Sequence, residues 1–207
     1  MNPAMTDVWL YRHAESLSNA GAKTLDPEGI PLTELGRRQA VKLAESLTRT
    51  PQRIIASPFR RSMSTAAEIL NRFPEADHEI WPIQEFTYLE PSSCVGTSWV
   101  ERKPRIDAYW ARLDPAFVDG PGAESFSSLL GRAREFLSDL LELTDDLVVA
   151  VSHGQFMQAT RIMAETPQLD DQTAMAVFRD AQAVRSFANC ERMVLKVDAG
   201  RVNVVGA

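Results

Sequence analysis

The sequence has few of the residues that cross-link a fold or bind a metal. Among its 207 residues there are 2 cysteines and 3 histidines, and no C-x-x-C pair occurs. A disulfide framework and a cysteine-based metal site are therefore excluded, and a reducing compartment fits best. No run of about 18 apolar residues occurs, and the N-terminus has no basic segment followed by an apolar one. We therefore expect a cytoplasmic protein with no membrane partner.

Positive charge is in the minority. The 22 Lys and Arg residues are outnumbered by 28 Asp and Glu, which gives a formal net charge of −6 and a sequence pI near 5.2. A protein that binds nucleic acid without sequence preference gains most of its affinity from neutralised phosphates, so we expect no nucleic-acid partner. The composition, 44% hydrophobic and 24% charged, is typical of a globular protein. The length predicts a single domain over residues 1–207.

Segments typical of strands and helices alternate along most of the chain. Apolar segments predict strands at residues 7–11, 53–57, 78–83 and 147–151, followed by a C-terminal hairpin at 193–205. Helical periodicity predicts helices at 34–49, capped by Thr33, and at 60–72, 124–143 and 155–165. This alternation predicts an α/β fold, a three-layer α/β/α sandwich with a mainly parallel sheet and an antiparallel C-terminal strand.

Residues 86–123 interrupt this alternation. They contain 4 of the 12 prolines and 2 of the 4 tryptophans. We expect an elaborated connection with a short helix at 105–113, and connections this long commonly cover or form a binding site. Trp99, Tyr109 and Trp110 suit either packing onto the sheet, which we prefer, or the docking of a protein partner.

Polar residues follow three of the predicted strands. Arg12 and His13 follow the first, Arg60 and Arg61 lie just after the second, and His153 follows the strand at 147–151. In an open α/β sheet, ligands bind at the carboxyl ends of the strands. Imidazole and guanidinium groups without nearby carboxylates or thiolates make a poor metal site and a good oxyanion site. We therefore expect a phosphate or similar anion there, with no metal and no cofactor.

Such a cluster can also perform chemistry. An imidazole placed against a phosphate can attack phosphorus and form a covalent intermediate. A protonated second imidazole, and the N–H groups of the helix that begins after His153, would strengthen anion binding. The leaving oxygen needs a proton, and the candidate donors are Glu85 and Glu90, just after the predicted strand at 78–83. Glu85 is nearer to the strand end and is preferred.

At these positions the sequence resembles the histidine phosphatase superfamily, which includes the cofactor-dependent phosphoglycerate mutases. Four blocks agree with the family in residue type and order: Leu10-Tyr-Arg12-His13-Ala14-Glu15-Ser16-Leu-Ser-Asn19, Pro31-Leu-Thr-Glu-Leu-Gly36-Arg-Arg-Gln39-Ala40, Ser57-Pro-Phe-Arg60-Arg61-Ser-Met-Ser-Thr65-Ala66 and Val149-Ala-Val-Ser-His153-Gly154. In addition, Ile83-Gln84-Glu85 falls where members of the family carry an acidic proton donor.

The resemblance implies a metal-independent phosphomonoesterase that acts on a small phosphorylated metabolite. It assigns His13 as the phosphorylated nucleophile and Glu85 as the general acid. The residues that would hold the phosphoryl group are Arg12, Asn19, Arg61, His153 and Gly154. Two alternatives stay open: a phosphoglycerate-type mutase, which a bisphosphorylated cofactor would stimulate, and a non-catalytic protein that binds a phosphorylated ligand.

Two features depart from the family pattern. Ala14 stands where members have glycine, and if the backbone there has a positive φ, alanine would cost about 1 kcal/mol and shift His13. This departure is the feature that favours the non-catalytic alternative. Residues 86–123 have no clear counterpart in the family pattern, so the resemblance does not specify the substrate.

Overall fold

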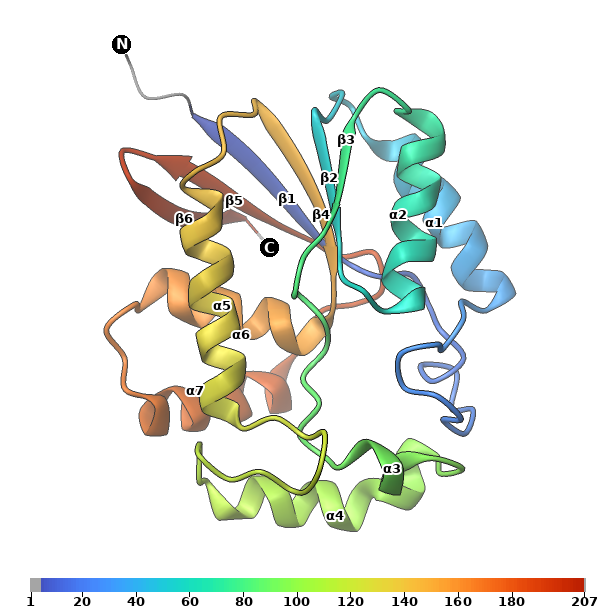
Figure 1. Cartoon of the computed structure of the whole chain (residues 1–207), viewed down its shortest axis with the longest axis vertical. Helices are drawn as coiled ribbons and strands as arrows, with labels where there is room; N and C mark the ends of the chain where they lie inside the picture. The colour runs from blue at the N-terminus through green and yellow to red at the C-terminus, as the bar shows by residue number, and fades with distance from the viewer. Residues whose placement is uncertain (1–4, 207) are drawn as a thin grey trace.

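The computed structural model describes residues 5–206, and its strands form one six-stranded sheet of order β3-β2-β4-β1-β5-β6 (Figure 1). The parallel strands are β1 (Thr6–Arg12), β2 (Arg53–Ala56), β3 (Asp77–Ile80) and β4 (Leu147–Ser152). The strands β5 (Arg192–Asp198) and β6 (Arg201–Gly206) are antiparallel and form one edge. The predicted α/β fold, with a mainly parallel sheet and an antiparallel C-terminal edge, is confirmed.

Helices cover both faces of the sheet (Figure 1). One face is covered by α1 (Glu34–Ser46) and α2 (Arg60–Arg72), and the other by α5 (Phe126–Leu140), α6 (Gly154–Glu165) and α7 (Asp171–Val184). Successive side chains of a strand point to opposite faces, so Val8 and Leu10 pack toward α5 and α6 while Trp9 and Tyr11 pack toward α1 and α2. None of the helices within residues 5–206 is both long and apolar enough to cross a membrane.

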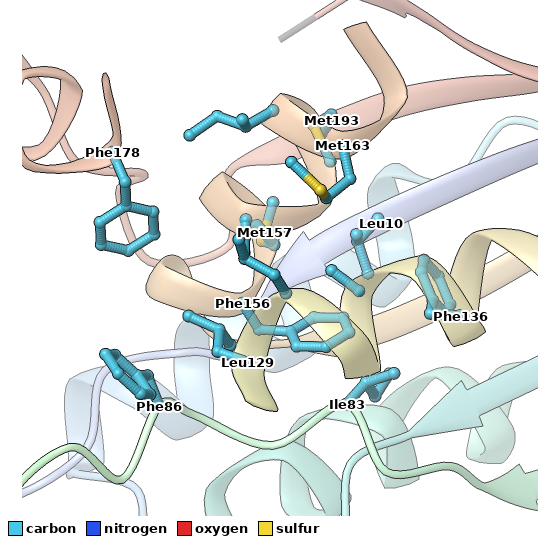
Figure 2. Packing of buried hydrophobic residues seen from close by; sticks show 14 of the residues in the cluster. Leu10, Ile83, Phe86, Leu129, Phe136, Phe156, Met157, Met163, Phe178 and Met193 are labelled. Atoms are coloured by element: carbon cyan, nitrogen blue, oxygen red, sulfur yellow. The ribbon is translucent and has the colours of Figure 1, made fainter. Parts of the chain in front are cut away.

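The larger apolar core lies between the sheet and α5, α6 and α7. Figure 2 shows Phe156 of α6 beside Leu129 of α5 in this core. Ile83 and Phe86, on the coil after β3, also turn their side chains into it and are 1% and 3% exposed. Because the coil is anchored on both sides of Glu85, the position of that carboxylate is set by the core.

Residues 86–123, called the cover segment below, lie across the carboxyl ends of the parallel strands (Figure 1). They contain α3 (Pro91–Cys94) and α4 (Trp99–Arg112). The helix expected at 105–113 is therefore longer, because Ser98 and Glu101 form a capping box that starts it earlier. The capping box places the start of α4 beside the cavity described below.

The aromatic residues of the cover segment mostly pack inward. Tyr109 is 2% exposed, and Trp110 stacks on Phe178 of α7 with ring centroids 5.6 Å apart. These two residues therefore bear out packing onto the fold, the interpretation preferred above. Trp99 is 54% exposed and lines the cavity.

The remaining differences from expectation concern element ends and one helix. The first predicted helix ends at Ser46, the strand expected at 78–83 ends at Ile80, and α5 begins at Phe126. The sequence pattern does not predict α7, in which the buried residues are Ala174, Met175 and Phe178. A stripe this narrow gives a weak periodic pattern, and the helix is defined by its packing against α5 and α6 instead.

Candidate active site

A cavity of about 610 Å³ lies between the carboxyl ends of the strands and the cover segment. Its lining includes six of the residues that the sequence singled out: Arg12, His13, Asn19, Arg61, Glu85 and Gly154. Its volume is within the range usual for small-molecule sites. The parallel register explains the convergence, because Arg12 of β1 pairs with Ser152 of β4, so both strands end at the same edge.

The hydrogen bonds of His13 define its tautomer. Its Nδ1 lies 2.7 Å from the carbonyl oxygen of Ala14, which can only accept, so Nδ1 carries the hydrogen. Its Nε2 accepts a hydrogen bond of 3.2 Å from Nε of Arg61, so Nε2 carries the lone pair. A neutral imidazole with its lone pair on Nε2 is the form that can attack phosphorus.

Both imidazoles are held in the neutral form. Burial, followed by the positive charge of Arg61, holds the pKa of His13 well below its usual value. Burial also lowers the pKa of His153 well below its usual value, with further contributions from Arg61 and His13. The expectation that the second imidazole is protonated is therefore wrong for the protein without a bound anion. A buried imidazole beside two guanidinium groups cannot readily hold another positive charge.

His153 is fully buried next to His13, with ring centroids 4.9 Å apart, and it is not part of the cavity lining. Its Nε2 lies 2.6 Å from the Oγ of Ser57, and that hydroxyl oxygen also accepts from the backbone N–H of Phe59 at 3.3 Å. Within residues 5–206, Nδ1 of His153 and Nε of Arg12 are buried and have no hydrogen-bond partner. These two polar atoms are thus unsatisfied.

Arg61, in the first turn of α2, is the buried guanidinium of the site. Its Nη1 donates to the carbonyl oxygen of Pro27 at 2.9 Å, and its Cζ lies 4.8 Å from the centroid of the Phe59 ring. Burial lowers the pKa of Arg61 to about 10, although the carboxylate of Glu85 acts in the opposite direction, so the group stays positively charged at pH 7. Arg60 is exposed. Of the two arginines, the structure therefore places Arg61 at the cavity.

The two candidate acids lie in different surroundings. The Oε1 of Glu85 accepts hydrogen bonds of 3.1 Å from the backbone N–H groups of Phe86 and Gln155. The second of these belongs to the N-terminal turn of α6, which favours a carboxylate. Glu90 is absent from the cavity lining, and its Oε2 lies 3.9 Å from Nη2 of Arg105. The geometry therefore places Glu85, and not Glu90, at the cavity.

Ala14 is accommodated without backbone strain. It is not among the non-glycine residues with positive φ in the part of the chain that the structure describes. Its methyl group is fully buried and packs with Leu32 and Ala40. The condition for a conformational cost of alanine, a positive φ, is therefore not met, and the feature that favoured a non-catalytic protein no longer supports it.

The second sequence block supports the loop that follows His13. The hydroxyl of Thr33 donates to Oε1 of Glu15 at 2.7 Å, and Oε1 of Gln39 accepts from the backbone N–H of Glu15 at 2.8 Å. A Cβ on Gly36 would lie 2.0 Å from the carbonyl oxygen of Glu15, so only glycine fits there. Sequence reasoning found this block but gave it no role. Its role is to hold Glu15, two residues after the nucleophile candidate.

Sequence reasoning missed three other residues at the site. Ser57 contacts His153 as described, and the Oγ1 of Thr65 accepts from the backbone N–H of Ala14 at 3.1 Å. Both stand in the third sequence block, which was the available signal. Arg102 of α4 has no such signal: its Nη1 donates to the carbonyl oxygen of Thr97 at 2.8 Å and to Oγ1 of Thr24 at 3.3 Å. It ties the cover segment to the loop after β1.

Comparisons with known proteins identify the family and the fold. Residues 8–204 match the family model for the histidine phosphatase superfamily (branch 1). The chain is 31% identical over 170 residues to phosphoserine phosphatase 1 of Hydrogenobacter thermophilus, covering 75% of this chain and 74% of that protein. It is 26% identical over 162 residues to the metal-independent phosphoserine phosphatase of Arabidopsis thaliana, covering 75% and 67%. The solved structure of a mycobacterial glucosyl-3-phosphoglycerate phosphatase has a similar fold, with a TM-score of 0.72 and 21% identity over 98% of this chain and 97% of that one.

Proposed function

Because the chain belongs to the histidine phosphatase superfamily (branch 1) and is a phosphatase with a histidine nucleophile, we propose that His13 is this nucleophile and that the substrate is a small phosphorylated metabolite. The observation that carries the proposal is the tautomer of His13. Its Nδ1 hydrogen is engaged by Ala14, and its Nε2 lone pair lies in the cavity wall beside Arg61. Among residues 5–206, no other histidine lines this cavity.

A bound phosphoryl group would satisfy the unpaired polar atoms of the site. Nε of Arg12 carries a hydrogen that an anionic oxygen would accept. If the Ser57 hydroxyl donates to Nε2 of His153, then Nδ1 of His153 carries the hydrogen and can donate as well. The approaching phosphoryl group would also take over the Arg61 N–H that lies on the His13 lone pair. Binding therefore frees the nucleophile at the moment when the phosphorus atom arrives.

The first step is transfer of the phosphoryl group to the enzyme. Nε2 of His13 attacks phosphorus, a nitrogen–phosphorus bond forms, and the bond from phosphorus to the ester oxygen breaks. Glu85 enters this step protonated, because a carboxylate beside the negatively charged phosphoryl group would be repelled, and it gives its proton to that oxygen, which leaves as an alcohol. The transition state spreads negative charge over the equatorial oxygens, so the positive charges of Arg12 and Arg61 stabilise it.

The second step regenerates the enzyme. Glu85, now a carboxylate, takes a proton from water while the water oxygen attacks phosphorus. The nitrogen–phosphorus bond breaks with its electron pair returning to Nε2, inorganic phosphate leaves, and His13 is neutral again. The same carboxyl group thus serves as acid in the first step and as base in the second.

The test is turnover of an aryl phosphate ester in EDTA, together with trapping of acid-labile phosphate on the protein. His13→Ala is expected to abolish both turnover and adduct. His78→Ala is the matched control, because His78 is exposed on β3, at the far edge of the sheet. Full activity of His13→Ala, or no adduct in the wild-type protein, would contradict the proposal.

The natural substrate is tested with the same assay. Phosphoserine is the first substrate to test, because two relatives carry the name phosphoserine phosphatase. Phosphoglycerates follow, in the presence and absence of a bisphosphorylated cofactor. Stimulation by that cofactor, with return of the phosphoryl group to the product, would identify a mutase instead. Binding of phosphorylated ligands without turnover would identify a non-catalytic protein.

A further inference from the structure

The main chain around the nucleophile candidate has one hydrogen bond for each polar group. The N–H of His13 donates to the carbonyl oxygen of Ser152 at 2.9 Å, and the N–H of Ala14 donates to Thr65. The carbonyl oxygen of Ala14 accepts from Nδ1 of His13 itself. The remaining group, the carbonyl oxygen of His13, accepts from Nδ2 of Asn189 at 2.9 Å. Asn189 lies near the other end of the chain, outside all four sequence blocks.

The same Nδ2 of Asn189 has a second acceptor at the site. It donates at 3.2 Å to Oδ1 of Asn19, which also accepts from the backbone N–H and the hydroxyl of Ser16 at 3.1 and 3.0 Å. Because a backbone N–H only donates, these contacts define which end of the Asn19 amide is the oxygen. The NH2 group of Asn19 is the end left to face the cavity that Asn19 lines. Asn189 therefore connects the nucleophile candidate to a phosphate-contact candidate.

Asn189 lies in a turn that is itself held against β1. The N–H of Glu191 donates to the carbonyl oxygen of Ala188 at 3.0 Å, and Cys190 between them has φ +60. A positive φ at the third turn position usually requires glycine, and a residue with a Cβ pays about 1 kcal/mol for it. Such a backbone conformation is kept only where contacts with the surrounding structure hold it in place. Here the N–H of Cys190 donates to the carbonyl oxygen of Arg12 at 3.0 Å.

The same turn region also contacts the Arg12 side chain, whose Nη1 donates to the carbonyl oxygen of Phe187 at 2.6 Å. Residues 187–190 thus touch the backbone of Arg12, its guanidinium group, the carbonyl of His13 and the amide of Asn19. Asn189 supplies two of these contacts and is absent from the cavity lining. Any effect of Asn189 on the substrate is therefore indirect and is exerted by way of His13 and Asn19.

We propose that Asn189 is a positioning residue for phosphoryl transfer: its side-chain amide sets the direction of His13 and turns the NH2 group of Asn19 toward the substrate. The proposal rests on the function proposed above. An error of about 1 Å in the position of a reacting group can lower a rate about 100-fold. Loss of the amide leaves the carbonyl of His13 without a partner and releases Asn19.

The experiment compares Asn189→Ala and the nearly isosteric Asn189→Asp with wild type. Asn71→Ala is the control, because Asn71 is exposed on α2 and its side-chain amide donates to Glu68 on the same helix. Rapid-quench mixing with an aryl phosphate measures the amplitude and the rate constant of phosphoenzyme formation. A positioning role predicts full amplitude with a rate constant lowered about 10- to 100-fold, and a kcat that falls more than KM changes. Asn71→Ala is expected to match wild type.

Each outcome decides the matter. A purely structural role would lower the amplitude, as folded protein is lost, and leave the rate constant of the folded fraction unchanged. That result, or a wild-type rate constant in both variants, would overturn the positioning role. If Asn189→Ala does not fold, Asn189→Asp decides, since it keeps the shape of the side chain and lacks the donor. If wild type forms no phosphohistidine, the proposed function fails instead, and the two failures are distinguishable.

Discussion

Replacing Ala14 by glycine restores the residue that the family pattern has at this position, and the structure predicts that it makes the protein worse. The backbone at Ala14 does not have a positive φ, so glycine relieves no strain. The methyl group is fully buried against Leu32 and Ala40, so glycine removes packing. We therefore expect Ala14→Gly to lower stability and leave catalysis unimproved.

The size of the effect follows from two contributions. Loss of a buried methyl group costs about 0.8 kcal/mol. The greater freedom of glycine in the unfolded chain costs a further ~0.4 to 1 kcal/mol. The free energy of unfolding should fall by roughly 1.5 kcal/mol, which for a chain of 207 residues lowers Tm by about 3 °C.

Thermal unfolding and steady-state kinetics with an aryl phosphate check this prediction. Ala20→Gly is the control, because Ala20 is exposed and its replacement removes no buried methyl group. The kcat/KM of Ala14→Gly should stay within about 2-fold of wild type, since its φ leaves His13 in place. A higher Tm, or a gain in kcat/KM of about 10-fold, would show that alanine does strain the nucleophile loop and refute the reasoning.

Four further predictions concern the cavity and its titrating groups. In the aryl phosphate assay with a leaving group of high pKa, Glu85→Gln should slow hydrolysis by about 100-fold or more, and Glu90→Gln should slow it far less. The reverse order would identify Glu90 as the general acid. Because the pKa of His13 is lowered and only the neutral imidazole attacks, the acid limb of kcat/KM should lie well below pH 6.5. The lowered pKa values of His13 and His153 keep both imidazoles neutral in the fold, while the imidazoles of the unfolded chain take up protons below about pH 6.5. The free energy of unfolding, measured by denaturant titration, should therefore fall as the pH drops below that value. A free energy of unfolding that does not change with pH in this range would contradict the neutral state of the two imidazoles. Arg102→Ala should raise KM about 3- to 10-fold with kcat nearly unchanged, because it removes the hydrogen bonds that connect the cover segment to Thr24. A fall in kcat at constant KM would indicate that Arg102 has a direct role in the chemistry.

The sheet and the convergence of the site were predictable because they depend on local patterns. Buried runs such as residues 147–151 predict strands, and in a parallel sheet the residues that follow the strands must meet at one edge. The choice of Arg61 over Arg60 depended on the family resemblance, because the two side chains are indistinguishable from their spacing alone. Their burial in the structure separates them.

Features that depend on contacts between distant segments could not be predicted. The neutral state of His153 follows from its depth beside Arg61 and His13, which no local pattern encodes. The tie between Arg102 and Thr24 and the contact between Asn189 and His13 join residues far apart in sequence. A single sequence shows that such polar residues are present and does not show which partner each one finds.

The hydrogen bond from His13 to the carbonyl oxygen of Ala14 has an evolutionary consequence. Where a side-chain carboxylate orients a catalytic histidine, one codon change can remove the acceptor and with it the correct tautomer. Here the acceptor belongs to the main chain, which every amino acid carries, so substitution at position 14 cannot delete it. The tautomer of the nucleophile is thus protected from substitution at position 14, where glycine and alanine present the same carbonyl oxygen to Nδ1.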